Sequence, residues 1–459
     1  MGITAAEIDG LLARFGNQIV NEQVNWATPF VGNGHIQKIK HTHELGIVRM
    51  RDSDGLQSTG QIEDGGTLPA GKNVSFEKGS YQPKIFFTRL SIPRAAAHLA
   101  AGGRDGVRLV KEEVEVAGRQ LGQVLGQAVF ESPIMTMYGP AASATIATAA
   151  ASIGFGAGAT IEIKVPSLAG LYISQFLGIT DSVGGRHENI EVVGMSSQIN
   201  TKVDGTALTD TNGKQLAAGF YSIQLKNNGL AIGAVNIGGV TDPVAAGVPG
   251  VDAPGTSALF IQKLTAAPTV AASMEPMTSL ADCYANATGL YGITNGNWTG
   301  NTQTLLNGLS IKAMRDMSTN IKRRAGGSWH MLVMNSSALQ RYFETGVTGP
   351  NDTFTNWLPG QTMKDADGGS TMPTFQGLPI VIDENVNDRD IYYFNKDDVK
   401  LAEFKDFATD SDTSSGSHGM VDRQSLIYDT QIWGMYNMRC TRRNSGGRLT
   451  NIFHEAVSA

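Results

Sequence analysis

One segment of the sequence has the spacing of a phosphate-binding loop. Gly66–Asn73 reads GTLPAGKN, in which GxxxxGK is present but Asn73 stands where such a loop has a Ser or Thr to hold magnesium. The loop binds phosphate only between a buried strand and a helix N-terminus, where backbone amides and the helix dipole converge. The residues on both sides are polar, with the spacing of extended chain. We therefore do not expect nucleotide binding here.

Histidines gather near the N-terminus, at His35, His41 and His43. In an extended segment His41 and His43 would lie on one face, as two metal ligands must. A metal site also needs a third ligand and ordered partners behind the ligands. We interpret these histidines as solvated surface residues.

Acidic residues offer two further candidate sites. Asp365, Asp367 and Gly368 match the start of a calcium loop, but the third acidic position and the closing Glu are missing, so a turn is the better interpretation. Asp397-Asp398 has no identifiable acid/base partner, and the sequence contains no GxSxG, HExxH or CxxC motif. We expect no catalytic residue, no cofactor, no metal site and no enzymatic activity.

The strongest structural signal is a helix predicted over residues 104–130. Its apolar residues recur in steps of three and four, which places them in one stripe, and they are Val107, Val110, Val114, Ala117, Leu121, Val124 and Ala128. Gly118, Gly122 and Gly126 follow a neighbouring ridge, and each costs about 1 kcal/mol of helix propensity. Close approach of another backbone would offset that cost. The partner is either an element of the same core or an arm or neighbouring subunit docked on a spine.

Composition excludes several classes of protein. Only 17% of the 459 residues are charged, which suggests that other chains cover much of the surface. A net charge of −6 gives no global basic field for sequence-specific DNA binding. No segment has the length and apolarity of a membrane span, and the N-terminus has no signal-peptide pattern. The two cysteines are expected to be free, buried thiols in a reducing compartment.

The rest of the chain predicts an α+β fold. Residues up to 43 have the pattern of an arm, and residues 44–90 that of a long two-stranded excursion formed by Ile47–Arg51 and Lys84–Thr88, with no apolar face of its own. A short capped turn is expected at Ser91–Arg94. Further strands are expected at 160–165, 190–193, 198–203, 220–225, 258–264, 329–334, 379–382, 390–394, 399–404 and 425–439, and helices at 302–324 and 336–343.

Charges are sorted along the sequence. Ten acidic residues against four basic ones lie between Asp383 and Asp412, whereas Lys322–Arg324 and four arginines from Arg439 to Arg448 form basic groups. Such runs are usually solvated faces. Complementary patches on one chain also suit head-to-tail contacts between copies, which close into rings.

The order of these parts resembles the major capsid protein of tailed double-stranded DNA bacteriophages, with its Hong Kong 97-type fold. Local stretches are similar as well. Gly289–Ile293 resembles the "GLxGI" piece before the second helix, and Trp329–Phe343 resembles the strand and helix that follow. Phe375–Val386 resembles the "GxPVxxxxxV" strand, and Tyr428–Ile452 resembles the closing strand with a "GR" turn at Gly447-Arg448.

The resemblance implies a shell protein that forms hexamers and pentamers of an icosahedral capsid around double-stranded DNA. Its partners would be copies of itself, a portal protein, a scaffolding or decoration protein and weakly bound DNA, with no membrane; it would be made in the host cytoplasm and reside in the virion. Gly118, Gly122 and Gly126 are the residues expected to serve packing and assembly. A cargo-enclosing bacterial nanocompartment of the same fold is the alternative. The implied parts are an N-terminal arm (1–43), an extended loop (44–90), the spine helix and first part of a peripheral domain (91–159), a β-rich insertion (160–267), an axial domain (268–390) and a C-terminal β return of the peripheral domain (391–459).

Overall fold

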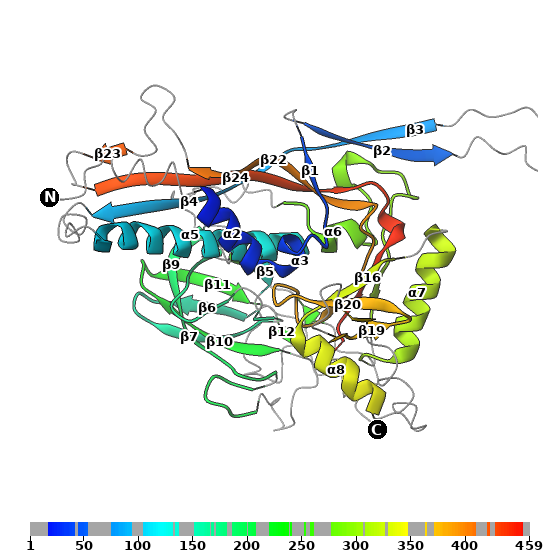
Figure 1. Cartoon of the computed structure of the whole chain (residues 1–459). Coiled ribbons are helices and arrows are strands. Elements are labelled where there is room, and N and C mark those ends of the chain that lie inside the picture. Colours follow the sequence, from blue (N-terminus) through cyan, green and yellow to red (C-terminus); the bar gives the residue numbers. More distant parts are fainter. Residues whose placement is uncertain are drawn as a thin grey trace, which may run out of the picture.

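A computed structural model gives the arrangement of the chain (Figure 1). The structure describes residues 17–41, 45–53, 75–93, 104–131, 134–136, 151–165, 167–168, 171–180, 186–199, 201–207, 220–237, 239–240, 252–253, 258–260, 277–305, 308–325, 329–347, 363–364, 371–409, 420–422 and 427–452. Long runs of strands are separated from the helices along the chain and do not alternate with them, so the predicted α+β class is confirmed. Within the described ranges, no helix has both the length and the apolarity needed to cross a membrane.

The long helix α5 (Arg104–Phe130) has the predicted bounds and lies against a long sheet. The sheet order is β1-β22-β24-β23, with β4 (Lys84–Pro93) also paired to β24 (Ile427–Cys440). Val114, Ala117 and Leu121 of the apolar stripe are buried against it. The remaining strands of this sheet are β1 (Lys38–Lys40), β22 (Val399–Thr409) and β23 (Met420–Asp422).

The N-terminal segment packs on α5 of its own chain. It forms α2 (Asn17–Ala27), α3 (Pro29–Gly32) and β1, which runs parallel to β22. Val20, Val24 and Phe30 belong to the same buried cluster as α5. The part of the expected arm from residue 17 to residue 41 therefore contributes to the core of this chain.

Two antiparallel strands form the base of the extended loop. They are β2 (Gly46–Ser53) and β3 (Ser75–Tyr81), called the hairpin β2–β3 below. The predicted pairing of Ile47–Arg51 with Lys84–Thr88 is wrong, because the second stretch lies in β4 and pairs with β24. Strand β4 also continues through Pro93, where a capped turn was expected. An alternating apolar pattern marks a strand but does not identify its partner.

A six-stranded sheet of order β15-β25-β21-β16-β20-β19 forms the second layer. Its strands are β15 (Thr302–Thr304), β25 (Gly447–Thr450), β21 (Asp390–Phe394), β16 (Met331–Met334), β20 (Leu378–Ile382) and β19 (Thr374–Phe375). The helix expected from 302 begins later, as α7 (Ile311–Ala325), because 302–304 pairs with β25. The expected boundary at residue 390 falls on β21, and Gly447-Arg448 opens β25 instead of forming a turn.

Shorter elements complete this layer and its connections. They are α6 (Leu280–Tyr284), η4 (Leu290–Gly292), α8 (Ser336–Val347), η6 (Arg443–Ser445), and the pair β17 (Met363–Lys364) and β18 (Thr371–Met372). Asn335 caps α8, since its side chain accepts the amide of Ala338.

The β-rich insertion has a core of its own and includes residues 134–136 and 151–155, so it begins before the expected residue 160. Its main sheet has the order β5-β14-β8-β9-β10-β7, beside the pairs β6–β11 and β12–β13. The strands are β5 (Ile134–Thr136), β6 (Ala151–Phe155), β7 (Thr160–Val165), β8 (Phe176–Thr180), β9 (Arg186–Met195), β10 (Tyr221–Asn227), β11 (Ile232–Ile237), β12 (Gly239–Val240), β13 (Asp252–Ala253) and β14 (Ala258–Phe260). The strand expected at 198–203 is absent from the described part of this segment, where only the bridge Thr201–Ala207 forms.

Candidate functional site

Several motifs with possible chemistry lie outside the described residues: Gly66–Asn73, His43, and the acidic segment Asp365–Gly368, for which a turn was expected. Within the ranges that the structure describes, no three His, Cys, Asp or Glu side chains gather as metal ligands would.

The described histidines and the Asp397-Asp398 pair have structural contacts. The His41 ring stacks on Phe404 at 5.0 Å between centroids, and its Nε2 lies 3.0 Å from the Tyr81 hydroxyl, so His41 is not the solvated residue that we expected. His35 stacks on Phe30. The Asp398 carboxylate accepts a hydrogen bond from the Thr441 hydroxyl, and Oδ2 of Asp397 lies 3.4 Å from Nε2 of His330.

The three glycines of α5, Gly118, Gly122 and Gly126, are here called the glycine ladder, and this ladder lies against other segments of the same chain. A Cβ atom on Gly118 would lie 3.2 Å from Cα of Val20 and 2.9 Å from Cβ of Gln23, both in α2. A Cβ on Gly126 would lie 2.7 Å from the Asn385 side chain and 2.8 Å from the Thr28 methyl group. Gly122 is buried between them. The absent side chains thus allow α2 and the segment after β20 to approach the helix closely.

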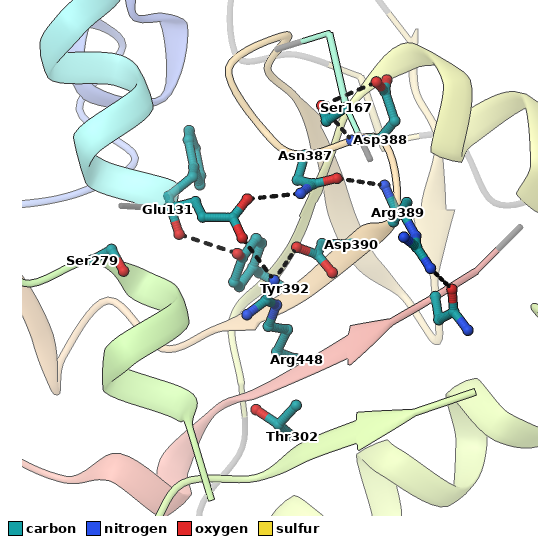
Figure 2. A network of polar contacts seen from close by, with 12 residues as sticks. Glu131, Ser167, Ser279, Thr302, Asn387, Asp388, Arg389, Asp390, Tyr392 and Arg448 are labelled. Atoms are coloured by element: carbon teal, nitrogen blue, oxygen red, sulfur yellow. Dashed lines mark hydrogen bonds and ion pairs between the residues drawn. The ribbon is translucent and has the colours of Figure 1, made fainter. Parts of the chain in front are cut away.

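A polar network joins the end of α5 to the second layer (Figure 2). Arg448 of β25 donates to Asp390 of β21 at 2.5 Å and lies 3.4 Å from Glu131, directly after α5. The Tyr392 hydroxyl donates to the Phe130 carbonyl at 3.1 Å. Because the Asp390 side chain is fully buried, Arg448 supplies the countercharge that its carboxylate needs.

The same network reaches the β-rich insertion through Asp388, which contacts the segment that follows β7. Its carboxylate accepts the Ser167 hydroxyl at 3.1 Å and the Leu168 amide at 3.3 Å, and it also accepts the Asn335 side-chain amide. Burial raises the pKa of Asp388 above its usual value, and these hydrogen bonds oppose that rise. Asp388 therefore connects the insertion to the N-terminus of α8.

The sequence did not indicate that charged residues connect the layers from inside the chain. The acidic run from Asp383 was interpreted as a solvated or intersubunit face, yet Asp383, Asp388 and Asp390 are buried within the chain. Arg443 is buried too and donates to five backbone carbonyls, those of Asp282, Cys283, Ala285, Ala287 and Trp298. The signal available in the sequence was that the acids alternate with strongly apolar strand segments.

Large apolar side chains gather on one face of the long sheet, here called the outer sheet face, which is formed by Ile85, Phe87, Trp433 and Met435. Phe87 pairs with Trp433 and Ile85 with Met435 across β4 and β24, so the four share one face. Ile85 is 60% exposed and Phe87 44%, whereas Phe86 between them is buried toward α5. Nζ of Lys405 lies 3.2 Å from the centre of the Trp433 ring.

The base of the hairpin β2–β3 has one buried face and one exposed face. Val48 and Tyr81 pack in a cluster with Ile293, Trp298 and Ala402. Leu45 and Ile47 lie on the opposite side and are 45% and 54% exposed. Figure 1 shows the hairpin beside the two layers, clear of α5. The body of the chain thus anchors the hairpin, which presents apolar side chains outward.

No protein-family model matches the sequence, and no curated protein does. Solved structures match along most of the chain. The capsid of cyanophage A-1(L) gives a TM-score of 0.46 at 11% identity, with 93% of each chain covered. The holo-SrpI encapsulin complex of Synechococcus elongatus gives 0.41 at 7%, covering 94% of this chain and 91% of that one. A structure from Mycobacterium phage Cain gives 0.39 at 11%, covering 95% and 91%.

Proposed function

We propose that this chain is a structural shell protein, the major capsid protein of a tailed double-stranded DNA bacteriophage with a Hong Kong 97-type fold. It self-assembles through hexamers and pentamers into an icosahedral capsid. The observation that carries the proposal is the outer sheet face, where large apolar side chains lie exposed on the long sheet. The nearby hairpin also shows apolar side chains on its free side.

Burial of these two surfaces on neighbouring copies would drive assembly. Fully burying an exposed Leu, Ile or Phe side chain contributes about 1.5–3 kcal/mol. The side chains of Ile85, Phe87, Leu45 and Ile47 are 44–60% exposed, so each would contribute about half of that value to an interface. The two surfaces lie on different elements of one chain. Contacts between different patches are head-to-tail, and such contacts close into rings when the rotation between copies permits.

The parts of the chain support the same proposal. The spine helix α5 and the long sheet would form the peripheral domain, and the second sheet with α7 and α8 would form the axial domain at the hexamer and pentamer centres. The network around Arg448 and Asp388 would fix these two domains and the insertion relative to one another. Gly118 and Gly126 would serve assembly indirectly, by seating α2 and the segments at Thr28 and Asn385 on α5, and Gly122 would do so as a buried position between them.

The remaining partners follow from this role. A portal protein would occupy one vertex, and scaffolding or decoration proteins would act during or after assembly. Packaged DNA would be held weakly and without sequence preference, since the net charge is −6. The protein would be made in the host cytoplasm and end in the virion.

Analysis of nuclease-treated particles tests this function. Particles from an infected or induced host should protect double-stranded DNA that resists DNase until the shell is denatured. Particles that protect a defined protein cargo and no DNA would instead identify a nanocompartment. A soluble monomer with catalytic activity would exclude both shells.

A further inference from the structure

The short element η4 (Leu290–Gly292) holds an aromatic residue in a left-handed backbone conformation. Tyr291 has φ 60° and ψ 21°, a region that residues with a side chain rarely adopt. The turn around it is closed by backbone hydrogen bonds, in which the Gly289 amide donates to the Ile293 carbonyl at 2.8 Å and the Gly292 amide donates to the Gly289 carbonyl at 3.0 Å. A bulky residue keeps such a conformation only where the surrounding contacts fix it.

The side chain of Tyr291 contacts two separate parts of the chain. Its hydroxyl accepts the amide of Cys440 at 3.1 Å and donates to the Met438 carbonyl at 2.7 Å, both in β24. Its ring lies against the ring of Tyr81 in β3, with centroids 5.3 Å apart. Tyr291 therefore joins the end of the long sheet to the hairpin β2–β3.

Tyr81 is enclosed on its other sides as well. Its hydroxyl lies 3.0 Å from Nε2 of His41, and a Cβ atom on Gly46 would lie 2.1 Å from the Tyr81 ring, so the ring rests on the Gly46 backbone. A Cβ atom on Gly79 would lie 2.9 Å from Cβ of Tyr291. The two glycines thus allow the hairpin to approach η4 closely, and Tyr81 is buried there.

We propose that these contacts form a hairpin seat, which fixes the direction of the hairpin β2–β3 within the single chain, before another copy binds, with Tyr291 as the positioning residue. The members of the hairpin seat are Tyr291, Tyr81, Gly46 and Gly79. A two-stranded ribbon alone is marginally stable in water, so a hairpin that keeps one direction needs contacts of this kind with the body of the chain. Tyr291 supplies them from one side chain, because it contacts β24 through its hydroxyl and β3 through its ring.

The hairpin seat would also lower the cost of assembly, and this part of the inference rests on the proposed shell function. Leu45 and Ile47 are 45% and 54% exposed, whereas Gly46 between them faces the hairpin seat. Because successive residues of an extended chain face opposite sides, these two side chains point away from the hairpin seat. A neighbouring copy would meet apolar side chains that are already ordered, so less conformational entropy is lost on binding.

Hydrogen–deuterium exchange of the full-length chain, at a concentration below that at which particles form, tests the hairpin seat. Tyr291→Phe keeps the ring and removes the hydroxyl, and the amides of β2 and β3 should then exchange about fivefold to tenfold faster. Gly79→Ala, whose methyl group would meet Tyr291, should act in the same direction. Tyr393→Phe is the matched control, since its buried hydroxyl donates to the Met314 carbonyl at 2.9 Å in the second layer.

Tyr393→Phe should lower the thermal midpoint and leave the exchange of the hairpin unchanged. Equal hairpin exchange in Tyr291→Phe and Tyr393→Phe, or wild-type hairpin amides that exchange as fast as those of an unstructured peptide, would overturn the hairpin seat. Particle formation is measured separately by electron microscopy. A loosened hairpin with an unchanged yield of particles would overturn the role in assembly, whereas a wild-type chain that forms no particles would contradict the shell function and leave the exchange result to decide the hairpin seat.

Discussion

The carboxylate of Asp383 accepts the backbone amide of Phe30 at 2.9 Å, although the two residues are 353 positions apart. Phe30 also meets the edge of Phe394 and tilts against Phe130, with ring centroids 4.9 Å and 5.3 Å apart. This contact fixes the N-terminal segment where the spine helix meets the second layer. The segment is therefore positioned by polar as well as apolar contacts.

Loss of the Asp383 carboxylate should loosen the N-terminal segment. In Asp383→Ala the buried amide of Phe30 loses its acceptor, and we expect the free energy of unfolding to fall by about 1–3 kcal/mol. Urea unfolding and the rate of proteolysis before residue 41 would measure this. Asp397→Ala, whose parent side chain is 70% exposed, is the control and should change little. Equal effects of the two substitutions would contradict the assigned role.

Asp388 should give the protein a characteristic dependence on pH. Its pKa is raised in the folded chain, chiefly by burial, so its stabilising contribution is complete below its unfolded pKa and is lost as pH rises through the folded pKa. Asp388→Asn removes this titration. Between about pH 4 and pH 7, the thermal midpoint of the variant should rise relative to that of the wild type. A relative fall over that range would show that the hydrogen bonds outweigh burial.

Bulky residues at the glycine ladder should disturb the spine without unfolding it. Gly118→Leu would push α2 away, at about 1–3 kcal/mol for overpacking, and expose the N-terminal segment to protease. Gly122→Leu, also at a buried site, should keep its circular-dichroism spectrum but fail to form shells. Gln123→Leu, on the exposed side of the same helix, is the control. Normal particles from the Gly122 variant in electron micrographs would refute its role in assembly.

A charge on the outer sheet face should separate folding from assembly. Phe87→Asp places a carboxylate on a face that is exposed in the single chain, so the thermal midpoint should hold within a few degrees while particles disappear. Gln82→Asp, just before the same strand, is the exposed control and should assemble. Sedimentation velocity would compare the two. If Phe87→Asp gave full-sized particles, this face would not be an interface.

The parts of the fold that were predicted depended on local periodicity. The stripe from Val114 to Ala128 defined α5 because a helix repeats its own pattern without reference to other segments. Local periodicity did not indicate which strand pairs with which. Nothing in Lys84–Thr88 distinguished β24 from β2 as its partner, and the polar residues that connect the layers, Asp383 and Arg448, meet only after long-range packing. The glycines predicted contact, while the identity of the contacting segment, α2, required the structure.

Sedimentation velocity combined with electron micrographs of the purified wild-type chain tests the shell assignment most directly. The proposal predicts closed icosahedral particles, or rings of five and six copies, whose fraction increases with protein concentration. A folded chain that remains a monomer or small oligomer at every concentration, even with its co-expressed genomic neighbours present, would contradict it.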